Sequence, residues 1–304
     1  MASGSDINIT GNVTLTGAEN SILKNYSFYP AQFKSLIIDK TNGAKVILDE
    51  TSSRPVVING TMMINEGGGF YSNCPTEFIL KGNFFSNGDF ECDAGAFKFE
   101  GNSQELGMSP DNYFYNLEIN PTSYVDIYTG KAISDEIHIH GSLILNSGVL
   151  RAGNSTIYVG KNWINNVGNT AFAYQQSKVV FNSESISEFQ LLTGNTVFNT
   201  LEIQQEPTIK LSIGDEAVVV CMAYDWTSGG IEVGSGSFTA YDLIDNKIAG
   251  NWKLYSGATI NLTDENAIGL GGNVVINGGI FNVYGGNNFW SFWPHYGNAS
   301  LTMS

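Results

Sequence analysis

The segment Phe97-Lys98-Phe99-Glu100-Gly101 contains the pattern that decides the fold: apolar and polar residues alternate, and a glycine follows. Alternation with a period of two is typical of a β-strand with one buried side. A glycine directly after such a strand indicates a corner that needs unusual backbone angles. The pattern also occurs as Val56-Val57-Ile58-Asn59-Gly60 and Phe78-Ile79-Leu80-Lys81-Gly82. It predicts short strands that each end in a tight turn.

These runs repeat at a nearly constant interval of about 20 residues, a period typical of repeat architectures. Nine of them begin in turn at Leu36, Val56, Phe78, Phe97, Leu117, Ile137, Ile157, Val179 and Leu201. A second apolar run, such as Met62-Met63-Ile64, lies between many of them, so each period holds at least two strands. Short strands also suit an antiparallel sandwich, but a fixed period is required only where each coil stacks on a copy of itself. The sequence therefore predicts an all-β parallel solenoid of about fifteen coils, with about 20 residues in each coil.

The composition agrees with a solenoid and excludes several other classes of protein. The 304 residues include 35 Gly and 33 Asn but only 7 Pro, and 14% are charged. Such a chain is a poor helix former and lacks the charge and proline typical of disorder. We expect the asparagines to form hydrogen-bonded ladders between stacked corners. The net charge of −15 disfavours a nucleic-acid partner, and no apolar stretch is long enough to span a membrane.

A longer period, equal to about four of the short ones, lies over them. Ile58-Asn59-Gly60-Thr61-Met62, for example, corresponds to Ile139-His140-Gly141-Ser142-Leu143, one long period later. We interpret residues 1–6 as a cloning remnant or disordered start and 7–304 as a single β-solenoid domain. Within it we predict tandem units at about 33–114, 115–197 and 198–285, followed by a partial coil and an aromatic-rich cap at 286–304.

The repeats resemble those of right-handed parallel β-helix proteins of the pectin-lyase-like superfold, and more narrowly those of exported bacterial surface and adhesin proteins. The motif that carries the resemblance is Phe198-Asn199-Thr200-Leu201-Glu202-Ile203, with its counterpart Tyr115-Asn116-Leu117-Glu118-Ile119. The resemblance implies a right-handed coil, which is also the general preference of parallel crossovers. It further implies secretion or location at the bacterial cell surface, and it supplies no catalytic residue.

Two groups of polar residues are candidates for chemistry. Asp89, Glu91 and Asp93 alternate along one predicted strand, so their carboxylates share a side about 7 Å apart and could act in catalysis or hold Ca²⁺. A solvated acidic face is the alternative. His138 and His140 likewise share a side with a spacing that could hold a metal ion, or they form a solvated surface pair.

Two further features leave alternatives open. Trp290, Trp293 and Tyr296 belong to an aromatic-rich segment that could stack on sugar rings or could cover the end of the core. Cys74 and Cys92 are separated by nearly one repeat and could meet in a coil of that pitch. The sequence does not decide between a disulfide and two small buried side chains.

These observations predict a non-enzymatic structural or adhesive segment of a secreted or cell-surface bacterial protein, without a required cofactor. The expected partner is an extracellular polysaccharide or the surface of a host or neighbouring cell. The alternatives are a carbohydrate-active β-helix, either a hydrolase or a lyase, and a glycan-binding module.

Overall fold

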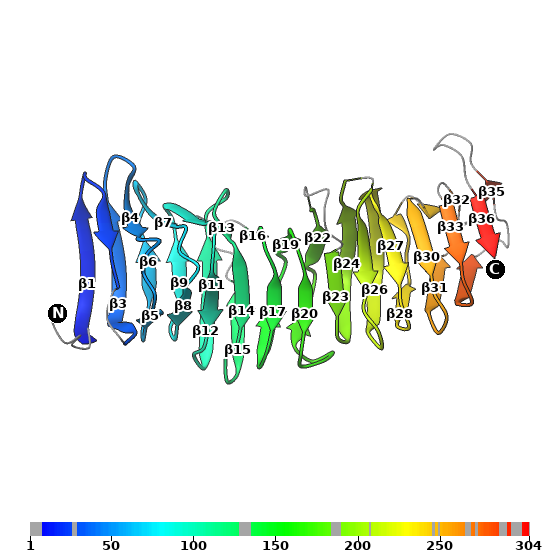
Figure 1. The fold of residues 1–304 in the computed structure, drawn as a ribbon, viewed down its shortest axis with the longest axis horizontal. Coiled ribbons are helices and arrows are strands. Elements are labelled where there is room, and N and C mark those ends of the chain that lie inside the picture. The colour runs from blue at the N-terminus through cyan, green and yellow to red at the C-terminus, as the bar shows by residue number, and fades with distance from the viewer. Residues whose placement is uncertain are drawn as a thin grey trace. The chain divides into compact units, whose positions relative to one another are not determined.

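The computed structural model describes residues 8–25, 29–127, 135–183, 190–206, 208–244, 247–248, 250–264, 269–270, 273–285, 291–292 and 300–303. These residues form strands joined by corners, with no α-helix among them, and the strands pair in parallel (Figure 1). The prediction of an all-β parallel solenoid is confirmed. The chain divides into two compact units, Met1–Ser155 (unit 1) and Thr156–Ser304 (unit 2). The described residues include no helix long and apolar enough to cross a membrane.

Each coil of unit 1 contributes strands to three parallel ladders, in which every strand pairs with the equivalent strand of the next coil. The first ladder contains β2 (Ser21–Leu23), β4 (Ala44–Leu48), β7 (Gly68–Ser72), β10 (Asp89–Cys92), β13 (Tyr113–Phe114) and β16 (Glu136–Ile139). The second contains β5 (Val56–Ile58), β8 (Glu77–Leu80), β11 (Ala96–Phe99), β14 (Asn116–Ile119) and β17 (Leu143–Leu145). The third contains β6 (Met62–Ile64), β9 (Phe84–Ser86), β12 (Ser103–Met108), β15 (Tyr124–Ile127) and β18 (Val149–Arg151). The long strands β1 (Asn8–Gly17) and β3 (Ala31–Lys40) pair with each other, and the early and late parts of β3 pair with β5 and β6, so both strands extend the second and the third ladder.

Unit 2 repeats this arrangement. Its first ladder contains β19 (Thr156–Val159), β22 (Lys178–Phe181) and the later parts of β24 (Thr196–Gln204) and β26 (Val218–Ser228). Its second contains β20 (Trp163–Asn165), β23 (Gln190–Thr193), β25 (Lys210–Ile213), β27 (Gly230–Val233), β30 (Asn251–Leu254), β33 (Asn273–Ile276) and β36 (Ser300–Met303). Its third contains the early parts of β24 and β26, then β28 (Ser237–Ala240), β31 (Thr259–Asp264) and β34 (Ile280–Gly285). The remaining strands are β21 (Phe172–Ala173) and a short ladder of β29 (Lys247–Ile248), β32 (Gly269–Leu270) and β35 (Ser291–Phe292).

The coils are longer and fewer than the sequence predicts. The described strands form about 11 turns of ~22 residues each, which is fewer than the fifteen shorter turns expected. Corner length explains the difference, because the coil from Phe78 to its partner Phe97 is short, whereas the coil from Leu117 to its partner Leu143 is long. The run at Ile137 therefore belongs to the first ladder, although a fixed period aligns it with Leu117 of the second.

The corner glycines are confirmed as corner residues, but for a different reason from the one expected. Gly82 is not among the glycines with a positive φ. A Cβ at Gly82 would instead lie 2.4 Å from the carbonyl oxygen of Gly60, the corner glycine of the preceding coil. Glycine is needed here because two stacked corners approach closely, and no larger residue would fit.

Large apolar side chains fill the interior of each unit. In unit 1 the ring of Phe97 is fully buried, and its centroid lies 5.0 Å from Phe78, 5.2 Å from Phe84 and 5.2 Å from Phe114. In unit 2 the buried Phe238 packs edge-on against Tyr224, at 5.6 Å. Burying one such side chain stabilises the fold by about 1.5–3 kcal/mol, so this stacked core is the main source of stability.

Asparagine side chains connect the coils, mostly by hydrogen bonds to backbone groups of the next coil. The Oδ1 atoms of Asn83, Asn116 and Asn195 accept hydrogen bonds from the backbone N–H groups of Glu105, Ser142 and Val218 in the following coil, at 3.0, 2.9 and 2.9 Å. Direct bonds between amides also occur, as between Asn282 and Asn261. The many asparagines thus satisfy backbone groups that the corners leave outside the strand ladders.

Candidate functional site

Both polar groups that the sequence singled out lie on the outer side of the first ladder of unit 1. Their side chains alternate with buried neighbours, since Phe90, Cys92, Ile137 and Ile139 point inward. The parallel register aligns Tyr71, Glu91, Tyr113 and His138 in one column. We call this surface the charged face, and its members are Lys45, Tyr71, Asp89, Glu91, Asp93, Tyr113, Glu136, His138 and His140.

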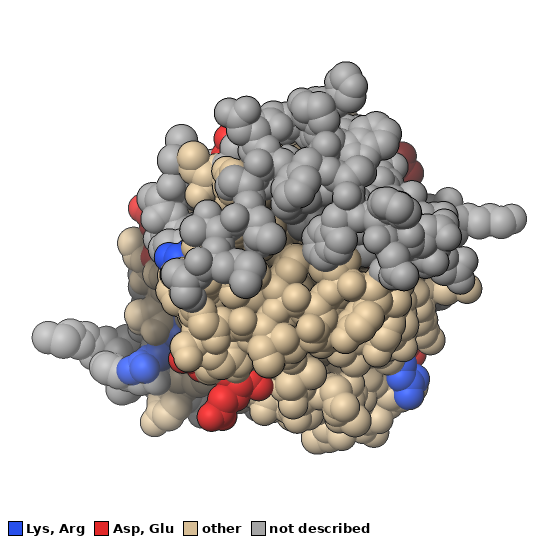
Figure 2. Space-filling model, turned by 90° about the vertical axis from the view of Figure 1, so that its right-hand side faces the viewer, with Lys and Arg blue, Asp and Glu red and all other residues tan. Residues whose placement is uncertain are grey.

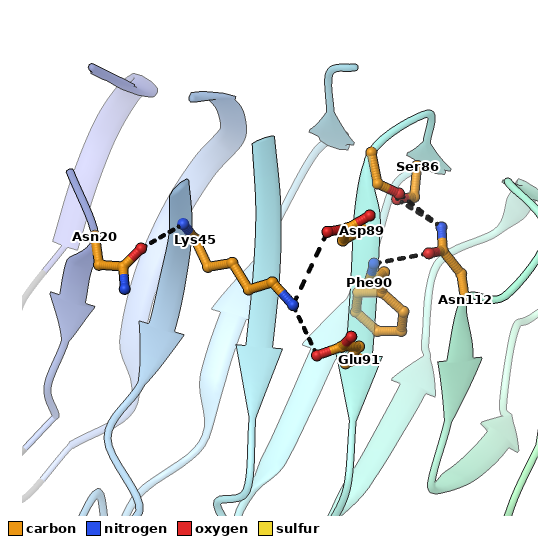
Figure 3. A network of polar contacts seen from close by, with 8 residues as sticks. Asn20, Lys45, Ser86, Asp89, Phe90, Glu91 and Asn112 are labelled. Atoms are coloured by element: carbon orange, nitrogen blue, oxygen red, sulfur yellow. Dashed lines mark hydrogen bonds and ion pairs between the residues drawn. The ribbon is translucent and has the colours of Figure 1, made fainter. Parts of the chain in front are cut away.

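Lys45 pairs with two of the three predicted carboxylates from two coils away. Its Nζ lies 2.8 Å from Oε2 of Glu91 and 3.9 Å from Oδ2 of Asp89 (Figure 3). The intervening strand carries Gly69 in register with both Lys45 and Asp89, and a Cβ there would lie 3.0 Å from Lys45 Cγ and 3.1 Å from Asp89 Cβ. The missing side chain at Gly69 lets the lysine extend across β7, as Figure 3 shows.

Asp93 joins the carboxylate group to the histidine group through Tyr113. The phenol of Tyr113 donates a 2.6 Å hydrogen bond to Oδ1 of Asp93, and its ring stacks on His140 with centroids 4.0 Å apart. Burial and this hydrogen bond raise the pKa of the Tyr113 phenol. The pKa of Tyr71 is also raised, chiefly by its interaction with the same carboxylate. Asp93 is thus the carboxylate that most affects the ionisation of Tyr71 and accepts a hydrogen bond from Tyr113.

The two histidines contact different neighbours on the charged face. Nε2 of His138 lies 3.5 Å from Oε2 of Glu136 on the same strand, while the ring of His140 stacks on Tyr113. In the part of the chain that the structure describes, no three His, Cys, Asp or Glu side chains are grouped as metal ligands. A metal or Ca²⁺ site on this face stays a prediction.

The buried polar corner beside the charged face is better defined. Asn112 accepts a 2.8 Å hydrogen bond from the backbone N–H of Phe90 and donates to Gly88 O at 2.9 Å and Ser86 Oγ at 3.1 Å (Figure 3). These bonds hold β10 at the position that directs Asp89 and Glu91 outward. The role of Asn112 is structural, because its amide is buried and already satisfied.

The other predicted features have the following outcomes. Trp290, Trp293 and Tyr296 lie outside the described residues. Cys74 and Cys92 are buried free thiols, so the disulfide alternative is not the one observed. Burial raises the pKa of the Cys92 thiol to about 11, which keeps it protonated and unreactive near neutral pH.

Ion pairs like those of Lys45 recur on other ladders. Lys98 lies 2.8 Å from Oε1 of Glu77 in the coil before it and 3.1 Å from Oε2 of Glu118 in the coil after it. In unit 2, Lys178 pairs with Glu202 and Asp225. A lysine that pairs with carboxylates of other coils thus recurs in the described part of both units. The paired carboxylates of the charged face do not by themselves indicate catalysis.

Sequence reasoning missed Lys45, Gly69 and Tyr113. Their importance depends on which residues lie beside each other in successive coils, and in this ladder the length of chain between partners changes from one coil to the next. A repeat of constant length cannot supply these partners. Comparisons with family models, curated proteins and solved structures gave no match.

Proposed function

We propose that the chain is a non-enzymatic structural and adhesive segment of a secreted or cell-surface bacterial protein, of the pectin-lyase-like β-helix type. One observation carries the proposal: the described lysines Lys45, Lys98 and Lys178 each pair with carboxylates of coils other than their own. Charged side chains used in this way stabilise stacking, and each pair contributes up to about 1 kcal/mol. The core beneath them is continuous within each unit, as a segment under mechanical tension requires.

A screen for polysaccharide turnover tests the proposal. We expect no release of reducing ends and no new unsaturated product when the chain is incubated with neutral and acidic polysaccharides. Turnover that is lost in the triple variant Asp89→Asn, Glu91→Gln, Asp93→Asn would overturn the proposal. Turnover that survives in this variant would overturn it as well and would place the reaction elsewhere on the chain.

The second candidate function is a carbohydrate-active β-helix. The observation that favours it is the position of Asp89 and Glu91 beside Tyr71 and Tyr113 on one outer face. Carboxylates for acid–base chemistry and aromatic rings for sugar stacking are the groups such an enzyme needs. Against it, Glu91 is ion-paired with Lys45, and the phenol of Tyr113 donates to Asp93. The same screen distinguishes the two functions.

A further inference from the structure

The outer side of the third ladder of unit 2 carries no charged residue in its described strands, in contrast to the charged face of unit 1. The parallel register of β24, β26, β28, β31 and β34 arranges the outward residues in three columns. We call this surface the uncharged face, and its members are Asn195, Val197, Asn199, Val218, Val220, Met222, Ser237, Thr239, Tyr241, Thr259, Asn261, Thr263, Ile280, Asn282 and Tyr284. Figure 2 views the molecule from the right-hand side of Figure 1, and most of the described atoms in that view belong to uncharged residues.

The middle column ties the coils together through neutral groups. Nδ2 of Asn261 donates to Oγ1 of Thr239 at 3.3 Å, and Nδ2 of Asn282 donates to Oδ1 of Asn261 at 2.9 Å. These bonds do for this face what the lysine–carboxylate pairs do for the charged face. The amide and hydroxyl groups of this column are half-buried and form a line along the direction in which the coils stack.

The two outer columns expose large apolar and aromatic side chains. Tyr284 is 59% exposed, Ile280 56% and Tyr241 53%, and Met222 lies in the same column as the two tyrosines. Thr263 lies between the two tyrosines in this column. It pairs with Tyr284 on one side. On the other side Leu262 pairs with Ala240, so the next residues, Thr263 and Tyr241, lie beside each other. Two tyrosines are thus repeated two coils apart, at about 9.6 Å, with a small hydroxyl residue between them.

We propose that the uncharged face binds a neutral polysaccharide chain that lies across the strands, along the tyrosine column. This rests on the proposed adhesive function and gives it a surface and a ligand class. A phenol ring offers an apolar face to a sugar ring, and the adjacent amides and hydroxyls can exchange hydrogen bonds with sugar hydroxyls. No ion has to lose its hydration shell for this contact to form.

Charge decides between neutral and acidic polysaccharides. The chain has a net charge of −15, so it repels a polyanion. The uncharged face contains no lysine or arginine that would offset this repulsion. A polycation would be drawn instead to the carboxylates of the charged face.

The area of the uncharged face argues against a second copy of the chain as its binding partner. Five strands and three outward positions cover about 24 Å by about 20 Å, or roughly 500 Å². A stable protein–protein interface needs about 800 Å² from each partner. The face is therefore too small for a stable dimer but has the size of a typical functional patch on a monomer.

Binding to suspended cellulose and mannan, with polygalacturonate as the acidic comparison, tests the proposal on the intact chain. We expect the chain to bind cellulose or mannan and not polygalacturonate. The double variant Tyr241→Ala, Tyr284→Ala should bind roughly tenfold more weakly. The matched control is Tyr29→Ala, which removes a tyrosine of similar exposure (52%) from unit 1 and should bind as the parent chain does.

A second variant protects the test against misfolding. Thr239→Glu with Thr263→Glu keeps both tyrosines but places two carboxylates on the face, and it should lose neutral binding while keeping the parent's circular dichroism spectrum. Absence of binding to both neutral polysaccharides, equal binding to polygalacturonate, or binding unaffected in both variants would overturn the proposal. Dimerisation lost in the tyrosine variant would also overturn it and would assign the face to self-association. Release of reducing ends during binding would instead count against the proposed non-enzymatic function alone.

Discussion

The charged face of unit 1 and the uncharged face of unit 2 use the same backbone arrangement for different outer surfaces. On the charged face, lysine–carboxylate pairs connect coils, as between Lys45 and Glu91. On the uncharged face, neutral bonds such as that between Asn282 and Asn261 connect them. Because the inward residues alone build the core, the outward residues are free to differ. Comparison of the two faces indicates that coil stacking sets the fold, while outward chemistry sets what each surface can bind.

The largest expected loss of stability tests whether the cores beneath the two faces are packed in the same way. Phe97→Ala in unit 1 and Phe238→Ala in unit 2 each remove a fully buried ring. Each should lower the free energy of unfolding by about 3–5 kcal/mol, because a cavity replaces packed atoms. Urea unfolding, with hydrogen exchange to assign the loss to a unit, measures both. A loss below about 1 kcal/mol in one of them would break the comparison.

A smaller loss of stability should distinguish the buried amide of Asn112 from the half-buried amide of Asn261. Asn112→Ala leaves the N–H of Phe90 and the carbonyl of Gly88 without their partner in a buried corner and should cost about 1–3 kcal/mol. Asn261→Ala on the uncharged face should cost less, about 0.5–1.5 kcal/mol, because its partners are half-exposed and can bind water. Equal losses in urea unfolding would contradict this ranking.

The salt dependence of stability should also differ between the two faces, by a smaller amount than the effects above. Lys45→Met removes partly exposed ion pairs and should lower the free energy of unfolding by no more than about 1 kcal/mol at low salt. The difference from the parent chain should shrink as salt is added, because ions screen the pairs. Thr239→Val, the matched variant of the uncharged face, should show no such salt dependence. A salt-independent loss for Lys45→Met would mean that packing of its alkyl chain, and not charge, is what the substitution removes.

The smallest effect concerns alkaline pH. The folded state raises the pKa of Tyr113, so it favours the neutral phenol over the phenolate. The resulting stabilisation is complete below the ordinary tyrosine pKa of about 10 and is lost as pH rises through the higher folded value. Tyr113→Phe should therefore reduce the decline in stability above about pH 10, as measured by thermal melting at several pH values. An unchanged alkaline decline would contradict the role of the bond to Asp93.

How much of this could be predicted from the sequence depends on what the repeat encodes. Strand and corner positions are encoded locally, so the parallel solenoid and the outward placement of Asp89, Glu91 and His138 follow from alternation. The ladder to which a strand belongs is not encoded locally. Ile58-Asn59-Gly60 leads from the second ladder to the third, whereas the similar Ile139-His140-Gly141 leads from the first to the second.

Because the sequence does not show to which ladder a strand belongs, it also does not predict the contacts that define the two faces. Tyr113 meets His140, and Lys45 meets Glu91, only because the intervening corners have particular lengths. The three columns of the uncharged face likewise depend on register over five strands. Physical contact across coils is a property of these corner lengths, which differ widely: the coil from Phe78 to Phe97 is short, and the coil from Trp163 to Leu192 is long.

Cross-linking in register tests the stacked-coil arrangement most directly. Thr239 and Asn261 are directly paired on adjacent parallel strands with outward side chains, which brings their Cα atoms within the range of a disulfide. The variant Thr239→Cys, Asn261→Cys should therefore form a cross-link on mild oxidation, found by mass spectrometry of its peptides. Thr239→Cys, Asn282→Cys spans two coils and should form none. Efficient cross-linking of the second pair and not the first would contradict the account.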